Sequence, residues 1–116
     1  MILKASSTGN SQDPNLQAWQ YNPTRAIECL RGGSVYDRYP KEGWAQDNGG
    51  EKVILVWEGR CKVVIDDTAH DVIPGDVVVI PKGAKFFIDA PFEKSVKCWI
   101  LNEGNFNEEQ INYLPI

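Results

Sequence analysis

The clearest signal of the fold is the segment PGDVVVIPKGAKF, residues 74–86. Its first two residues, Pro74-Gly75, are a strong turn signal. The β-branched run Val77 to Ile80 is typical of a strand that is covered on both faces. The run ends at Pro81-Lys82-Gly83, because proline removes a ladder hydrogen-bond donor and glycine permits the next reversal. The stretch therefore predicts a turn, a buried strand, a second turn and a new strand.

Strand and turn signals recur along the rest of the chain. From residue 53 onward the turns fall about 8–12 residues apart, which is the spacing of an all-β sandwich or barrel. A polar, glycine-containing loop is expected over residues 40–50, and a turn at Gly32-Gly33. Acidic residues near the start of residues 107–113 favour one short C-terminal helix. Strands are predicted at residues 26–30, 35–39, 53–57, 61–65, 69–73, 77–80, 85–89 and 96–101.

The chain is predicted to have an arm and one domain. Residues 5–23 are rich in Ser, Asn, Gln and Pro, and an exposed Trp19 in a floppy tail would be wasteful. We therefore expect residues 1–23 to form an N-terminal arm that is docked or strand-swapped, and residues 24–116 to form a single barrel domain. A chain of 116 residues is long enough to form a hydrophobic core without disulfides or metals.

Composition excludes several classes of partner and location. The net charge of -4 argues against nucleic acid and anionic membranes, which require clustered Lys and Arg. No run approaches the roughly 20 apolar residues that span a bilayer. The three cysteines, Cys29, Cys61 and Cys98, are far apart and form no CxxC pair. We interpret them as reduced, buried thiols in a cytoplasmic protein.

The segment at residues 74–86 also resembles a known family motif. Gly75 is followed six residues later by Pro81 and eight residues later by Gly83, which is similar to the second sequence motif of the cupins. That motif places a metal-binding His three residues after its last Gly, where this chain has Phe86. The resemblance implies an all-β fold, the double-stranded β-helix or jelly-roll barrel, with a ligand pocket at one open end.

The first cupin motif is matched only in its hairpin, at Val53 to Gly59. Counting back seven residues from that glycine places the motif's Glu position at Lys52, and its two His positions at Gln46 and Asn48. The two motifs together cover about residues 43–90. Within the cupins, the chain looks most similar to small single-domain proteins of the ethanolamine-utilisation EutQ type and its relatives of unknown function.

These departures predict a barrel without a metal or other cofactor. Transition metals need imidazole, thiolate or carboxylate ligands, whereas Gln46 and Asn48 offer weak amide oxygens. Lys52 would add a positive charge, and Phe86 has no lone pair to donate. A slip of the strand by one residue would exchange faces and turn Glu51 inward in place of the lysine.

Lys52 is the predicted catalytic candidate. If its side chain projects into an apolar barrel beside Phe86, burial lowers its pKa and makes it a base or a Schiff-base amine. The alternative is that it sits at a frayed strand start and reaches solvent. The only histidine, His70, lies outside both motifs and is interpreted as a surface residue on an edge strand.

Three further side chains are predicted to bind a ligand. Tyr36 and Arg38 alternate on one strand face and so could point into the same pocket. Arg38 could hold a carboxylate in a bidentate fork, or else be solvated. Trp44 either lines the pocket mouth or packs as a core residue. With Gln46, Asn48 and Phe86, these residues complete the predicted ligand-binding set.

These residues are compatible with more than one function. The first is a metal-independent binding module for a small polar or carboxylate-bearing organic ligand. The second is a metal-independent isomerase, lyase or cyclase acting next to a carbonyl, with Lys52 as base and Gln46, Asn48 or Tyr36 polarising the oxygen. A third reading is a structural subunit whose barrel is simply filled. Many cupins dimerise through their sheets and N-terminal strands, so the resemblance also implies a homodimer.

Overall fold

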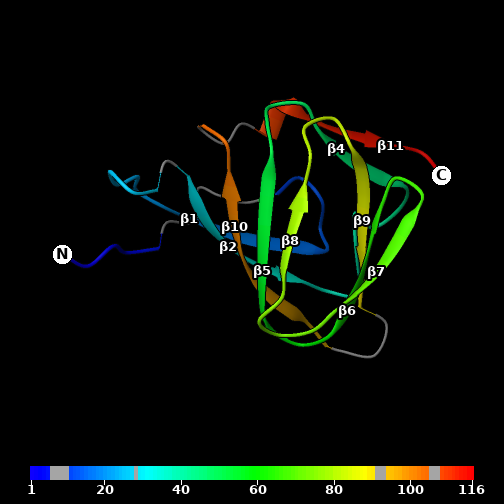
Figure 1. The fold of residues 1–116 in the computed structure, drawn as a ribbon, viewed down its shortest axis with the longest axis horizontal. Helices are drawn as coiled ribbons and strands as arrows, with labels where there is room; N and C mark the ends of the chain where they lie inside the picture. The colour runs from blue at the N-terminus through cyan, green and yellow to red at the C-terminus, as the bar shows by residue number, and fades with distance from the viewer. Residues whose placement is uncertain (6–10, 28, 91–93, 105–107) are drawn as a thin grey trace.

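A computed structural model of the chain describes residues 1–5, 11–27, 29–90, 94–104 and 108–116. These residues form two antiparallel sheets that pack face to face as a jelly roll (Figure 1). The first sheet, sheet A, has the order β1 (Leu16–Tyr21), β2 (Leu30–Val35), β10 (Val96–Asn102), β5 (Lys52–Glu58) and β8 (Val77–Ile80). The second, sheet B, has the order β11 (Ile111–Leu114), β4 (Trp44–Asp47), β9 (Lys85–Asp89), β6 (Cys61–Ile65) and β7 (Thr68–Val72), and β3 (Arg38–Tyr39) also pairs with β9.

The core lies between the two sheets because side chains alternate between the inner and outer faces of each strand. On β10 the inward positions are Val96, Cys98 and Ile100, and all three are buried. On β6 they are Cys61 and Val63, also buried, whereas Lys62 between them is exposed. All three cysteines of the chain are free and buried.

The stretch at residues 74–86 folds as predicted in its turns but not in its burial. Gly75 has φ of 98°, in the left-handed region that favours glycine, and β8 then covers Val77–Ile80. The strand is an edge strand that pairs only with β5 among the described elements. Val77 and Val79 are therefore 55% and 48% exposed on its outer face. The prediction of a strand covered on both faces was wrong.

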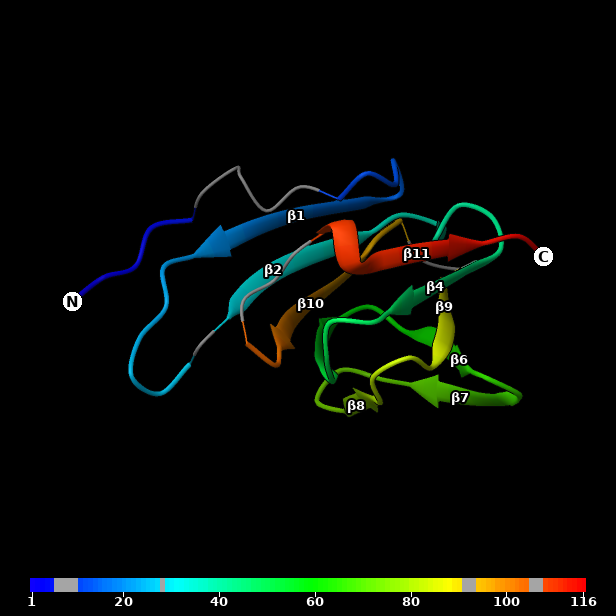
Figure 2. The ribbon, with the colours of Figure 1, turned by 90° about the horizontal axis from the view of Figure 1, so that it is seen from above.

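The segment before residue 24 contains a strand of the barrel. β1 pairs with β2 along its whole length, and its Leu16 and Ala18 side chains are buried. The predicted turn at Gly32-Gly33 is instead the middle of β2, which corrects the strand predicted over residues 26–30. Gly32 is needed there because a Cβ at this position would collide with the Trp19 indole. Figure 2 shows β1, β2 and β10 side by side in one layer.

The C-terminal helix prediction was also wrong. The described residues there form a single 3₁₀ turn, η2 (Glu108–Gln110), which leads directly into strand β11. Ile111 pairs with Asp47 of β4 and is buried, so pairing with the sheet edge prevails over the helical preference of the acidic residues. The predicted loop over residues 40–50 likewise contains β4. None of the helical residues described here forms a segment long and apolar enough to cross a membrane.

Candidate functional site

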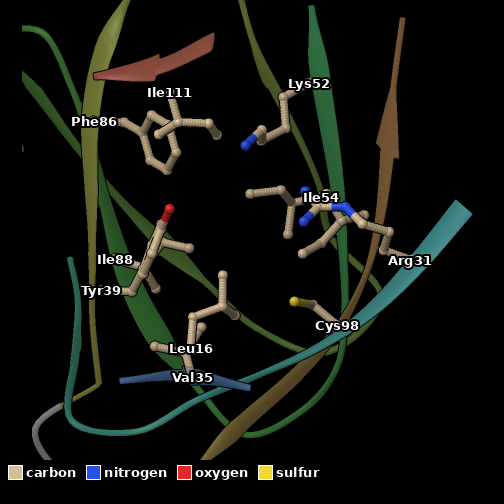
Figure 3. A pocket seen from close by; sticks show the side chains of 11 residues that line it. Leu16, Arg31, Val35, Tyr39, Lys52, Ile54, Phe86, Ile88, Cys98 and Ile111 are labelled. Carbon is tan, nitrogen blue, oxygen red and sulfur yellow. The ribbon is translucent and has the colours of Figure 1, made fainter. Parts of the chain in front are cut away.

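The candidate site is a small cavity between the two sheets. Its volume is about 10 Å³, which is roughly the room of one water molecule. Figure 3 shows the Lys52 amine and the Tyr39 hydroxyl pointing into this space from opposite sheets. Most of its wall is aliphatic or aromatic. The lining residues are Leu16, Arg31, Val35, Tyr39, Lys52, Ile54, Phe86, Ile88, Cys98, Ile100 and Ile111.

Three charged side chains are buried at this cavity or bonded to its wall. Arg31 is 1% exposed, Lys52 is 4% exposed and Asp47 is 5% exposed. Lys52 Nζ lies 3.4 Å from Asp47 Oδ2, so the two form a buried ion pair. Burying charged groups is costly unless they are paired and hydrogen-bonded. A cluster of this kind inside an apolar barrel is therefore a candidate for function.

Asn102 links the members of this cluster. Its Nδ2 donates a hydrogen bond of 3.0 Å to Asp47 Oδ2, and its Oδ1 accepts one of 3.2 Å from Arg31 Nη2. The register explains the arrangement, because Asn102 of β10 lies directly across from Lys52 of β5. We call Arg31, Asp47, Lys52 and Asn102 the charged cluster.

The Asp47 side chain is fixed from sheet B. The backbone N–H of Gly49 donates to Asp47 Oδ1 at 2.8 Å, which closes a local turn at the end of β4. The backbone N–H of Gly83 donates to the Asp47 carbonyl at 2.9 Å, so the turn after β8 also holds this residue. The carboxylate is thus a fixed counter-ion that joins the two sheets at one end of the barrel.

A tyrosine and a thiol complete the polar part of the cavity wall. The Tyr39 hydroxyl lies 3.1 Å from the Tyr113 hydroxyl, which lies 3.3 Å from the Ser11 hydroxyl. This chain of hydroxyls runs from the cavity toward the N-terminal segment. Burial raises the pKa of the Cys98 thiol to about 12, so the thiol lines the cavity in its protonated form at neutral pH.

Two of the sequence-predicted site residues line the cavity. Lys52 projects inward, which contradicts the alternative that it reaches solvent, and Glu51 is exposed. Phe86 is fully buried, and the Lys52 ammonium lies 5.4 Å from its ring centroid. The pairing of these two positions inside the barrel follows from the motif spacing.

The remaining predicted residues lie away from the cavity. Asn48 is exposed, and Gln46 is half-buried with its Nε2 donating to the Gly83 carbonyl at 2.8 Å. On β4 it is Ala45 and Asp47 that face inward, one residue away from the expected register. The one-residue difference places the whole predicted pair on the wrong face.

Tyr36, Arg38 and Trp44 are also outside the cavity wall. Tyr36 is 44% exposed and its hydroxyl donates to Gln17 at 3.3 Å. The Arg38 guanidinium donates to the carbonyls of Pro40 and Gly43, at 2.8 Å each, and stacks 4.1 Å from the Phe87 ring centroid. The Trp44 ring packs against the same phenylalanine at 4.9 Å between centroids. The contacts of Arg38 and Trp44 stabilise the loop between β3 and β4 on the outer face of sheet B.

Sequence reasoning missed Arg31, Asp47 and Tyr39. Arg31 was hidden because the glycine pair that follows it was interpreted as a turn, so its strand was ended too early. Asp47 was passed over between two residues that had been aligned with metal ligands. A consistent period of two through residues 44–47 would have separated Ala45 and Asp47 from their neighbours.

A larger depression lies on the surface near the start of β6. Its volume is about 440 Å³, and its wall includes Lys62, Asp71, Asp89 and the apolar Ile73. Lys62 lies across from Asp71 on one side and from Asp89 on the other. Exposed charges that alternate in sign are common on protein surfaces, so the buried charged cluster is the stronger candidate site.

Metal ligands do not gather in the described part of the chain. No group of three or more His, Cys, Asp and Glu side chains among these residues could hold a metal ion. At the charged cluster, Asp47 is the one carboxylate described, and Lys52 places a positive charge beside it. The donor set of this cluster does not fit a transition metal.

The fold is similar to several solved structures. A Streptomyces PAC13 variant with uridine has a TM-score of 0.74 at 10% identity, over 99% of this chain and 92% of that one. A cupin superfamily protein from Desulfitobacterium hafniense has a TM-score of 0.64 at 14% identity, over 90% of this chain and 100% of that one.

A third similar structure is a much longer protein. The salicylate 1,2-dioxygenase of Pseudoaminobacter salicylatoxidans, with gentisate, has a TM-score of 0.63 at 19% identity, over 79% of this chain and 26% of that one. No protein-family model and no curated protein sequence matches the chain. Identities this low establish architecture alone. The chain has the double-stranded β-helix fold of the cupin superfamily.

Proposed function

We propose that this protein is a metal-independent cupin that binds a small polar or carboxylate-bearing organic ligand inside its barrel. The observation that carries the proposal is the charged cluster, in which Arg31 and Lys52 are buried beside a largely apolar cavity. Apolar walls with a few fixed polar groups are typical of small-molecule sites. Two of the similar structures contain a small organic molecule, uridine in one and gentisate in the other, which supports ligand binding as a function of this fold.

A ligand larger than one water molecule requires the cavity to widen. Lys52 is the side chain best suited to move, because its flexible stem starts at the first residue of β5, next to the loop at residues 48–51. Leu16 is the second, because it comes from the edge strand β1. The ligand site is therefore proposed to form by local rearrangement of these side chains.

The alternative is a metal-independent isomerase, lyase or cyclase with Lys52 as base. Tyr39, which faces the same cavity, would replace Tyr36, Gln46 and Asn48 as the group that polarises the carbonyl oxygen. The ion pair with Asp47 favours the binding function, since a paired ammonium has no lone pair with which to take a proton.

The test is native mass spectrometry of the protein purified without chelators, combined with elemental analysis. A co-purified organic ligand in the wild type that is lost or weakened in Lys52→Met, with folding intact, supports a binding protein. Turnover of that ligand that disappears in the same variant supports the enzyme. A stoichiometric transition metal would contradict both proposals.

We also propose that the protein is a cytoplasmic homodimer. The outer face of sheet A carries one cross-strand row of Trp19, Gly32, Trp99, Leu55 and Val77. The Trp57 ring stacks beside Trp99 at 6.4 Å between centroids. An exposed face of aromatic and aliphatic groups is typical of a protein interface. A monomeric mass by light scattering at working concentration would contradict the dimer.

A further inference from the structure

We propose that residues 13–16 form a strap that closes the cavity, and that this strap opens to admit the ligand while the rest of the barrel stays folded. Leu16 is the side chain that blocks the entrance. This inference rests on the proposed function and names how the same site is reached. It follows from the attachments of the strap, from what Leu16 covers and from its position at the end of an edge strand.

The strap connects the two sheets. Its last residue, Leu16, is the first residue of β1 and so belongs to sheet A. The Asn15 Nδ2, in contrast, donates a hydrogen bond of 2.8 Å to the carbonyl of Arg38 on β3, which pairs within sheet B. Asp13 Oδ2 accepts another of 2.8 Å from the backbone N–H of Lys41, in the loop after β3. The strap therefore closes the space between the sheets at the edge where β1 lies.

Leu16 covers an inner part of the cavity wall. It is 7% exposed and lines the cavity together with Cys98. Leu16 Cδ1 and Cys98 Sγ lie 3.4 and 3.2 Å from the point that a Cβ on Gly33 would occupy, so the two side chains are neighbours over that glycine. Figure 3 shows both side chains projecting into the same space. An outward movement of Leu16 therefore uncovers the thiol and enlarges the cavity.

The position of Leu16 makes this movement possible without unfolding the barrel. Leu16 pairs with Val35 at the end of the β1–β2 ladder, and β1 is an edge strand among the described elements. Terminal pairs of this kind open at a much lower free energy than the whole fold. The ladder continues as far as Tyr21, and the Trp19 indole packs over Gly32, so the rest of β1 stays in place.

Asp13 holds the strap in its closed conformation. Its Oδ1 accepts a hydrogen bond of 3.0 Å from the backbone N–H of Asn15, which forms a local turn, while its Oδ2 binds the loop after β3. The carbonyl of Asn15 in turn accepts a bond of 2.8 Å from the backbone N–H of Tyr36. Removing the Asp13 carboxylate should therefore favour the open strap and leave the paired strands intact.

The experiment measures how fast the Cys98 thiol is modified in the folded protein. The full chain carries Cys29→Ala and Cys61→Ala, so Cys98 is the one thiol left. The probe is methyl methanethiosulfonate, a small reagent that transfers its methylthio group to a thiolate, and mass spectrometry follows the reaction at pH 8. Burial raises the pKa of this thiol to about 12, so the closed cavity protects it. We expect a rate that is independent of urea at low concentrations and faster than global unfolding allows.

Two strap variants and a control are compared in this background. Asp13→Ala should speed modification by roughly fivefold, which is the effect of one lost hydrogen bond on an opening equilibrium. Asn15→Ala should act in the same direction, and it keeps the test valid if the first variant unfolds. Asp76→Ala is the matched control, because Asp76 Oδ2 also accepts a backbone N–H, that of Ile73 at 3.0 Å, but in the turn between β7 and β8. Its rate should equal that of the background protein.

Leu16 and Ile111 allow the two sheet edges to be compared. Each side chain is 7% exposed, lines the cavity and begins an edge strand, β1 of sheet A or β11 of sheet B. Leu16→Ala should speed modification of Cys98 at least roughly tenfold more than Ile111→Ala, because only the first variant removes the side chain that closes the strap. Both rates are measured at urea concentrations where each variant is fully folded.

The outcomes separate this inference from the proposed function. Modification that follows global unfolding at every urea concentration overturns the strap, and so do rates in Asp13→Ala and Asn15→Ala no faster than in Asp76→Ala. Equal rates in Leu16→Ala and Ile111→Ala overturn the role of the leucine. A strap that opens in a protein without any co-purified organic ligand supports the inference and removes support from the binding function. A co-purified ligand in a protein whose thiol follows global unfolding does the reverse.

Discussion

Lys52 and Asp47 form an ion pair whose energy depends on both partners staying in place. Each is almost fully buried, and the amine and carboxylate are 3.4 Å apart. Coulomb attraction and hydrogen bonds offset the cost of removing two charges from water, but neither charge is tolerated alone. The cluster should therefore be a sensitive point of the fold as well as the candidate ligand site.

Removing one partner should cost much more here than at the surface. Lys52→Met is expected to lower the free energy of unfolding by about 3–5 kcal/mol, because Asp47 stays buried without its ion-pair partner. The double variant Lys52→Met/Asp47→Asn should recover part of that loss. Urea titration measures all three proteins.

Lys97→Met is the matched control for this prediction. Lys97 Nζ lies 3.3 Å from Glu58 Oε2, a similar distance, but both side chains are substantially exposed. Exposed pairs contribute about 0–1 kcal/mol, so this variant should differ little from wild type. Equal losses in the two lysine variants would contradict the role given to burial.

The two inward thiols should make stability depend on pH above 9. Burial raises the pKa of Cys61 to about 11 and that of Cys98 to about 12, from an ordinary value of 9.0. Below pH 9 the thiols are protonated in both the folded and unfolded states, so this contribution is fully present. From pH 9 toward 12 the unfolded chain releases thiol protons first, so the free energy of unfolding falls.

The variant Cys61→Ala/Cys98→Ala isolates this effect. Tyrosine and lysine side chains also ionise in this range, and they do so in both proteins. The decline in unfolding free energy between pH 8 and pH 10 should be steeper in wild type than in the double variant. Identical slopes would show that the thiols do not contribute.

Among the strands, the pairing of β1 with β2 depends on a contact between the large indole of Trp19 and Gly32, which has no side chain. The Trp19 indole lies over Gly32, where a Cβ would collide with the ring. Gly32→Ala should therefore destabilise the fold by more than the few tenths of a kcal/mol expected of an ordinary surface change, on the order of 1–3 kcal/mol. Adding Trp19→Ala should relieve the clash.

A double-variant cycle by urea titration measures that coupling. The cost of Gly32→Ala should be much smaller in the Trp19→Ala background than in wild type. Additive costs would mean that the tryptophan does not pack on this glycine. The same cycle reports whether β1 stays paired, because the two residues lie directly across from one another.

The sequence predicts some secondary-structure elements of this fold and not others, and the difference has physical reasons. The turns of the stretch at residues 74–86 were predicted well because their residues act locally, through proline and glycine backbone preferences, whereas the exposure of Val77 and Val79 depends on the place of β8 at the sheet edge. β1, β4 and β11 were missed because tertiary pairing decides them, and a polar or acidic segment such as residues 107–113 carries no local sign of it. Gly32-Gly33 was misread because the reason for the glycine, Trp19, lies on another strand.

For the site residues too, those fixed by local sequence signals were predicted, and those that depend on tertiary pairing were not. Lys52 and Phe86 were found because a motif fixes their distance from a glycine turn. Gln46 and Asn48 were misplaced by one residue, since the loop before β5 has no such anchor, and in a strand that shift exchanges the faces. Arg31 could not be linked to Lys52 from the sequence, because the strand between them, β10, comes from near the other end of the chain.

At the scale of the molecule, the two faces of sheet A have opposite roles. The inner face carries the charged cluster, and the outer face carries the tryptophan row. If that outer face joins two copies, a charge placed on it should separate them. Trp57 is 44% exposed, so Trp57→Glu should yield monomers with little change in the free energy of unfolding.

Light scattering and urea titration of the same samples measure this prediction. Lys62→Glu, a charge change on the outer face of sheet B, is the control and should leave the mass unchanged. A dimeric mass in the Trp57→Glu variant would place the interface elsewhere, for example along the edge strand β1.

The inward face of β4 makes this barrel a suitable host for a transplanted metal centre. Ala45 and Asp47 face inward on β4, Ala45 lies directly across from Phe86 of β9, and Asp47 contacts Lys52 of β5. Four inward positions on three strands are thus already adjacent at one end of the barrel. Histidine at the first two and at the phenylalanine, with glutamate at the lysine, would supply imidazole and carboxylate donors there. The backbone geometry for metal catalysis would then be inherited rather than designed.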